Sequence, residues 1–116
     1  MSEIIYDLSF ITDVAKGNKD FIKSLIEVFI SNTPPIAAEM RDAYDAKDWD
    51  RLAKLAHKLK STIDTMGLIT IKDDIRFIET NAKAVAELAT INEKIDKVKT
   101  VVDNCVTKLQ LEPVFN

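Results

Sequence analysis

The segment Trp49–Gly67, WDRLAKLAHKLKSTIDTMG, contains apolar residues that recur in alternating steps of three and four. This spacing places them along one face of a single α-helix. The stripe consists of Trp49, Leu52, Ala56, Leu59, Ile63 and Met66. Asp48 is a suitable N-cap and Gly67 a suitable stop, so we expect one amphipathic helix between them.

Two further helices are predicted downstream. The first follows Gly67 after a short break, so it should lie antiparallel to its predecessor, and Thr70 with Asp73 can form a capping arrangement at its start. Its stripe is Ile71, Ile75, Ile78 and Ala82. The segment 90–93, Thr-Ile-Asn-Glu, has the pattern of a capping box that opens the last helix. That stripe is Ile91, Ile95, Val98, Val102, Cys105 and Leu109.

Upstream, Asp7 can cap a short helix over about residues 8–16, and Asn18 can cap the next one. The Thr33-Pro34-Pro35 step then allows two readings. Either a new helix starts with Pro34 at its first position, or one long helix over about residues 19–46 is kinked by the prolines. We favour the kinked helix, because helical spacing continues beyond the prolines at Ile36, Met40 and Tyr44.

Four long helices and one short helix, joined mostly by tight turns, predict an all-α fold. The expected architecture is an antiparallel up-down four-helix bundle with a short extra N-terminal helix. The chain has 116 residues, 47% of them hydrophobic, with two glycines and three prolines. This size and composition suit one core, so we assign residues 1–116 to a single helical bundle domain.

Composition and charge exclude several classes. A formal net charge of -3 argues against a nucleic-acid partner, which usually requires a basic surface. No segment approaches the roughly 20 apolar residues of a membrane span. The single cysteine, Cys105, falls on an apolar stripe and should be buried, and the start MSEIIYD does not resemble a secretory signal. We therefore expect a cytoplasmic protein, and we expect it to be monomeric.

His57 is the only histidine, and it lies outside the stripe of its own helix. At about 100° per residue it points roughly 130° from the centre of that stripe. Its neighbours one turn away, Ala53 and Ser61, are both small, so we expect the ring to stand on an open patch that a partner can approach. Lys60, three residues later, can share this patch.

Such an imidazole suits phosphoryl transfer through a phosphohistidine. At cytoplasmic pH it is largely neutral, so one ring nitrogen keeps a lone pair for attack on phosphorus. A nearby lysine can stabilise the charge of the phosphoryl oxygens. Between Trp49 and Met66 the basic residues exceed the acidic ones by two, which favours an anionic adduct and an acidic partner. Orientation alone favours an ordinary solvated histidine, which is what a single exposed histidine on a lysine-rich helical face usually is.

The sequence gives little support for the enzyme classes that a helical bundle could carry. A carboxylate-bridged metal bundle requires inward Glu and Glu-x-x-His pairs, which are missing here, and haem attachment requires Cys-x-x-Cys-His. Neither a strained turn for a nucleophile nor a group that would orient a catalytic base points to a Ser-His-Asp triad, although residues distant in sequence could form one. The chain is therefore expected not to be an enzyme, to need no cofactor and to hold no metal.

The segment His57-Lys58-Leu59-Lys60-Ser61-Thr62, followed by Met66-Gly67-Leu68, resembles the signature of histidine-containing phosphotransfer (Hpt) domains. Asp7-Leu8-Ser9-Phe10, the run 21–34, Asp48-Trp49 and the pattern from Ile71 to Glu79 extend the resemblance over most of the chain. It implies a phosphocarrier of two-component phosphorelays, with His57 as acceptor and Lys60 as phosphate partner. The implied partners are receiver domains of response regulators and a histidine kinase or hybrid kinase, with Mg²⁺ on the receiver.

Two positions depart from the family pattern. Ser61 replaces its usual glycine, which keeps a small residue but adds a hydroxyl that could bond phosphate, and Ile63 replaces a small hydroxyl residue. Because Ile63 lies on the stripe, we expect it in the core. Across the predicted hairpin, Glu79 should lie level with His57 and could orient its ring, or it could be a solvated carboxylate. The alternative function is a docking module that binds receiver or kinase domains without carrying phosphate.

Overall fold

The computed structural model describes residues 6–112 and contains five α-helices in this range. They are α1 (Ser9–Val14), α2 (Lys19–Asp45), α3 (Trp49–Thr65), α4 (Ile69–Ala84) and α5 (Leu88–Leu109). No strand occurs between residues 6 and 112, so the predicted all-α class is confirmed. None of these helices is both long enough and apolar enough to cross a bilayer.

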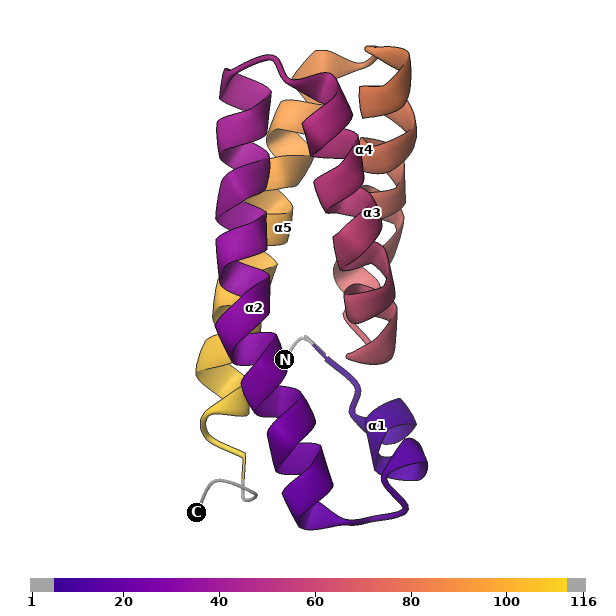
Figure 1. Cartoon of the computed structure of the whole chain (residues 1–116), viewed down its shortest axis with the longest axis vertical. Coiled ribbons are helices and arrows are strands. Elements are labelled where there is room, and N and C mark those ends of the chain that lie inside the picture. Colours follow the sequence, from indigo (N-terminus) through magenta and orange to yellow (C-terminus); the bar gives the residue numbers. More distant parts are fainter. Residues whose placement is uncertain (1–5, 113–116) are drawn as a thin grey trace.

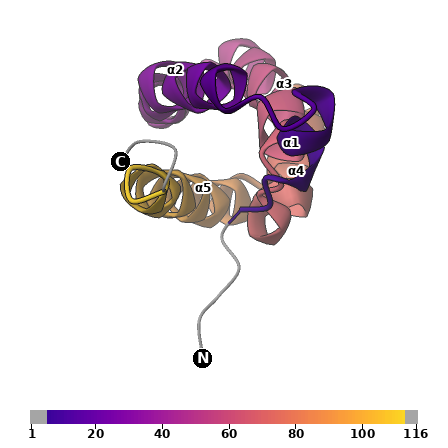
Figure 2. The same cartoon turned by 90° about the horizontal axis from the view of Figure 1, so that it is seen from below.

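The four long helices run alternately up and down and form a bundle (Figure 1). α3 packs against α2 and α4, and α5 closes the bundle by packing against α2 and α4. The short α1 lies at one end, in front of α3 and α4 when the bundle is viewed from that end (Figure 2). The predicted antiparallel four-helix bundle with a short extra N-terminal helix is therefore confirmed.

The predicted stripes supply the core. Leu52, Leu59 and Ile63 of α3 are 0% exposed, and Cys105 of α5 is equally buried. The corresponding buried residues of the last two helices are Ile71, Ile75, Ile78, Ala82, Ile91, Ile95, Val98, Val102 and Leu109. Burial of Ile63 confirms that this position packs inward. Burial also raises the pKa of the Cys105 thiol to about 12.

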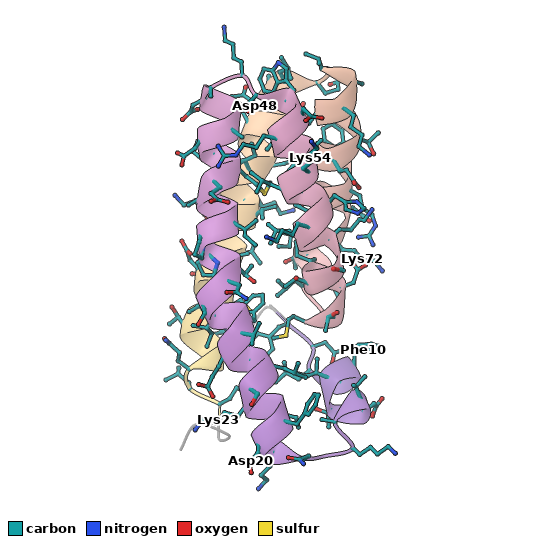
Figure 3. All side chains as sticks on the ribbon, in the orientation of Figure 1. Phe10, Asp20, Lys23, Asp48, Lys54 and Lys72 are labelled. Atoms are coloured by element: carbon teal, nitrogen blue, oxygen red, sulfur yellow. The ribbon has the colours of Figure 1, made fainter. Side chains whose placement is uncertain are left out.

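The two long N-terminal helices begin where their caps were expected. Asn18 Oδ1 accepts a hydrogen bond from the backbone N–H of Phe21, and Asp48 Oδ1 accepts one from that of Arg51. α2 continues through Pro34 and Pro35 as one helix, which confirms the favoured reading. Its two halves are inclined to each other (Figure 1). Asp48 marks the bundle end where α2 meets α3, and Phe10 of α1 lies at the other (Figure 3).

The last two helices begin at other residues than the capping patterns predicted. α4 begins at Ile69, directly after the Gly67 turn, and its N-cap residue Leu68 makes no side-chain cap bond, so Thr70 already lies inside the first turn. α5 begins at Leu88, two residues before Thr90, after the left-handed residue Glu87. In both cases the preceding turn sets the helix start, and the capping patterns fall within the helix.

Gly67 lets the N-terminal segment cross the turn between α3 and α4. Asp7 N–H donates a hydrogen bond of 3.1 Å to the carbonyl of Met66, and Asp7 Oδ1 accepts bonds from the backbone and hydroxyl of Ser9 at the start of α1. Gly67 has φ +66°, and a Cβ there would lie 2.6 Å from the backbone oxygen of Asp7. The turn therefore requires glycine both for its backbone angle and for this close approach.

Candidate functional site

His57 lies near the middle of α3, and its side chain is 67% exposed. The residues that precede and follow it on the apolar stripe, Ala56 and Leu59, are fully buried. The face of α3 that carries the ring is therefore opposed to the core, as the helical spacing predicted. The surrounding core holds this face in place without covering the imidazole.

Glu79 of α4 contacts the ring across the α3–α4 hairpin. Its Oε2 lies 2.5 Å from Nδ1 of His57, although 22 residues separate the two in sequence. Glu79 therefore lies level with His57 along the bundle, as predicted. Its side chain is only 10% exposed, so Glu79 is not a solvated carboxylate. An ionised carboxylate can only accept, so Nδ1 carries the proton of this bond. In the neutral ring, Nε2 then keeps the lone pair.

Two lysines share the same carboxylate. Lys60 Nζ donates a hydrogen bond of 2.9 Å to Oε1 of Glu79, and Lys83 Nζ lies 3.8 Å from its Oε2. Lys60 is half-buried, whereas the Lys83 side chain is 67% exposed. The sequence reasoning missed Lys83, although it follows Glu79 by four residues and therefore lies on the same face of α4.

The charge of Glu79 is secured by these neighbours. The hydrogen bond from Lys60 is the main reason that the pKa of Glu79 lies below its usual range, and the hydrogen bond from His57 adds to this, while burial acts in the opposite direction. Glu79 is consequently ionised at neutral pH. The site combines one buried negative charge, two ammonium groups and an exposed imidazole.

The two small neighbours of His57 differ in their surroundings. Ser61 is exposed, as expected. Ala53 is only 2% exposed and belongs to the core, so the expectation that it borders an open patch was wrong. α3 packs against both α2 and α4, and this double contact covers more of its circumference than the apolar stripe alone indicates.

An open groove runs between α2 and α3, the helix that carries His57. It has a volume of about 290 Å³, and Lys58 and Ser61 of α3 line it opposite Val28 and Ile36 of α2. Ser61 thus belongs both to this groove and to the turn that follows His57. Within residues 6–112, no cluster of three or more His, Cys, Asp or Glu side chains has a geometry that could hold a metal ion.

The arrangement provides a nucleophile with a defined free nitrogen and cations for a transferred anion. A comparison with family models supports the same chemistry, since the model of the Hpt domain matches residues 24–110. This match includes His57, Lys60, Glu79 and Lys83, and it leaves out α1 and the first turn of α2. No curated protein and no solved structure is significantly similar to the chain.

Proposed function

Since the chain belongs to the Hpt domain family, which serves histidine phosphotransfer in two-component systems, we propose that His57 is its phosphoryl acceptor. The observation that supports this most directly is the bond between His57 Nδ1 and Glu79, which leaves Nε2 of an exposed ring as the nucleophile. The phosphoryl group comes from the aspartate of a receiver domain or from a kinase. It then passes to the aspartate of another receiver.

The transfer step proceeds without a separate base. The Nε2 lone pair forms the new bond to phosphorus, and the bond from phosphorus to the receiver aspartate breaks, so that the aspartate leaves as a carboxylate. The ring keeps its proton on Nδ1 and becomes positively charged. Glu79, which is ionised and 2.5 Å from Nδ1, stabilises this positive ring. The reverse sequence returns the phosphoryl group to a second receiver.

Lys60 stabilises the phosphoryl oxygens in this scheme. Its ammonium group already lies beside the ring because both bond Glu79, and its long side chain can reach an adduct on Nε2. Lys83 supplies a second, more exposed positive charge 3.8 Å from the same carboxylate. Mg²⁺ is assigned to the receiver partner, and no metal is assigned to this chain.

The partners that fit this role are receiver domains of response regulators and a histidine kinase or hybrid kinase. The basic surplus of α3 complements the acidic site in which a receiver would hold its phosphate and metal. Ser61 leaves room for a close approach to His57, whereas buried Ala53 takes no part in the contact. We further propose that the protein acts as a cytoplasmic monomer and binds neither nucleic acid nor membrane.

The proposal is tested by labelling. The protein is incubated with a panel of phosphorylated receiver domains, and its label is tested for loss in acid and persistence in alkali, as a phosphohistidine requires. We expect label on the wild type and none on His57→Gln. Ser24→Ala, which changes an exposed side chain on α2, serves as a control that should label normally. Equal label on wild type and His57→Gln, or none on either across the panel, contradicts the proposal. The second result, if receivers still bind, identifies a docking module without phosphate.

A further inference from the structure

The hydroxyl of Ser61 makes no hydrogen bond within residues 6–112, the part of the chain that the structure describes, and the side chain is exposed. Ser24 and Thr107 differ, because their hydroxyls donate to the backbone carbonyls of Asp20 and Asp103 one turn earlier, the usual partner of such a group in a helix. The hydroxyl of Ser61 is therefore available to a ligand.

The position of this hydroxyl relative to the ring is set by α3. Ser61 follows His57 by four residues, so the two lie on the same face, and the Cα–Cβ bond of Ser61 leans toward the turn that carries His57. Glu79 draws Nδ1 toward α4. Nε2 consequently points away from α4, and Ser61 lies on that other side, where it lines the groove between α2 and α3.

We propose that the Ser61 hydroxyl donates a hydrogen bond to a phosphoryl oxygen on Nε2 of His57 and thereby stabilises the phosphorylated state. This inference rests on the function proposed above. Lys60 and Lys83 approach the ring from the side of Glu79, and both also neutralise that carboxylate. Ser61 has no such competing partner among the described residues, and it reaches the phosphoryl group from the opposite side. It extends the phosphate site beyond the lysines, at the position where the chain departs from the glycine of the family pattern.

A competition experiment measures this contribution directly. Phosphorylated wild type is mixed with an equal amount of unphosphorylated Ser61→Ala and a trace of a receiver domain that exchanges phosphate with the wild type. Intact-protein mass spectrometry at neutral pH then gives the phosphorylated fraction of each form at equilibrium. The receiver acts only as a shuttle, so the equilibrium ratio does not depend on which receiver is used. Circular dichroism confirms that each variant is folded.

We expect the phosphoryl group to favour the wild type over Ser61→Ala by about three- to tenfold, the effect of one hydrogen bond to a charged group at an exposed site. Ser61→Thr, which keeps the hydroxyl, should lie closer to the wild type. Thr65→Val is the matched control, because Thr65 lines the same groove one turn farther from His57. It should not shift the ratio.

The inference fails if Ser61→Ala competes equally with the wild type, or if Thr65→Val produces the same shift. Its failure can be told apart from failure of the proposed function. A wild type that takes up no label on His57 contradicts the function itself, whereas a labelled wild type with an equal ratio contradicts only the role of Ser61.

Discussion

Nδ1 of His57 and Oε2 of Glu79 lie 2.5 Å apart across the hairpin of α3 and α4, which makes the carboxylate the partner of one particular ring nitrogen. A neutral imidazole has two tautomers, and a carboxylate that accepts from Nδ1 stabilises the one with its proton there. The hairpin therefore selects the nitrogen that remains free for chemistry.

This relationship predicts the effect of Glu79→Ala on the ring. Nitrogen-15 chemical shifts of the imidazole should show the Nδ1–H tautomer in the neutral ring of the wild type, and Glu79→Ala should move the population toward Nε2–H. Glu79→Gln, whose amide oxygen can still accept, should keep the tautomer but lose the negative charge. If Glu79→Ala leaves the ring shifts of the wild type unchanged, Glu79 does not orient the imidazole.

The two lysines should contribute unequally to transfer. Lys60 is half-buried and hydrogen-bonded to Glu79, whereas Lys83 is more exposed and 3.8 Å away, so solvent screens its charge more strongly. We expect Lys60→Ala to slow transfer from a receiver by about 10- to 100-fold, the value of a charge-assisted hydrogen bond, and Lys83→Ala by less than about tenfold.

Rapid-quench measurements of transfer rates, with unfolding curves for both variants, test this order. Lys99→Ala provides a comparison, because Lys99 is an exposed lysine of α5, a helix that carries none of the site residues. An unchanged transfer rate in Lys60→Ala removes that residue from the mechanism. A larger loss in Lys83→Ala than in Lys60→Ala reverses the assignment of the main phosphate ligand.

The sequence predicted the helices of the bundle well, because the spacing of apolar residues indicates which face of each helix is buried. The stripes of α3, α4 and α5 were found where the spacing placed them, and the side chains of Asn18 and Asp48 bond backbone groups at helix starts as expected. The start of α5 was missed. Two non-glycine residues with positive φ, Val85 and Glu87, form the preceding turn, and no local preference indicated this.

The site was predicted less completely, because its members come from different helices. Spacing along α3 gives the direction of His57 and of Lys60, but it does not show how closely α2 and α4 cover the rest of the helix. Ala53 was therefore expected at the surface, although it is buried in the core. The approach of Glu79 depends on the register of the hairpin. Lys83 enters the site only through Glu79, and therefore no pattern centred on His57 could identify it.

Gly67 should be far less tolerant of substitution than Gly17. Both have positive φ, but a Cβ at Gly17 meets nothing within 4 Å, whereas one at Gly67 meets the backbone of Asp7. We expect Gly17→Ala to lower the free energy of unfolding by about 1 kcal/mol, the cost of the left-handed conformation, and Gly67→Ala by about 2–4 kcal/mol. Urea unfolding at neutral pH measures both. Equal losses would show that the Asp7 segment can move aside at no cost.

Asp74 gives the bundle a pH-dependent contribution to stability at a distance from the histidine. Its side chain is 9% exposed, and Oδ1 and Oδ2 lie 2.6 Å and 2.8 Å from the ammonium groups of Lys94 and Lys97 on α5. Burial tends to raise the pKa of Asp74, but the hydrogen bonds and the charges of Lys94 and Lys97 together outweigh it, and the pKa lies below its usual value. The contribution is therefore fully present above about pH 4, the pKa of an unfolded aspartate, and is lost as the pH falls through the folded pKa.

Asp74→Asn should consequently lower the free energy of unfolding by about 1–3 kcal/mol at pH 7, because it leaves two lysines without their shared partner. As the pH falls toward about 2, the wild-type carboxylate becomes protonated and the difference between the two proteins should shrink. Urea unfolding across this pH range, with the exposed Asp103→Asn as control, follows the difference. A difference that stays constant with pH would mean that Asp74 stabilises the bundle through packing, since only the charged form can gain from Lys94 and Lys97.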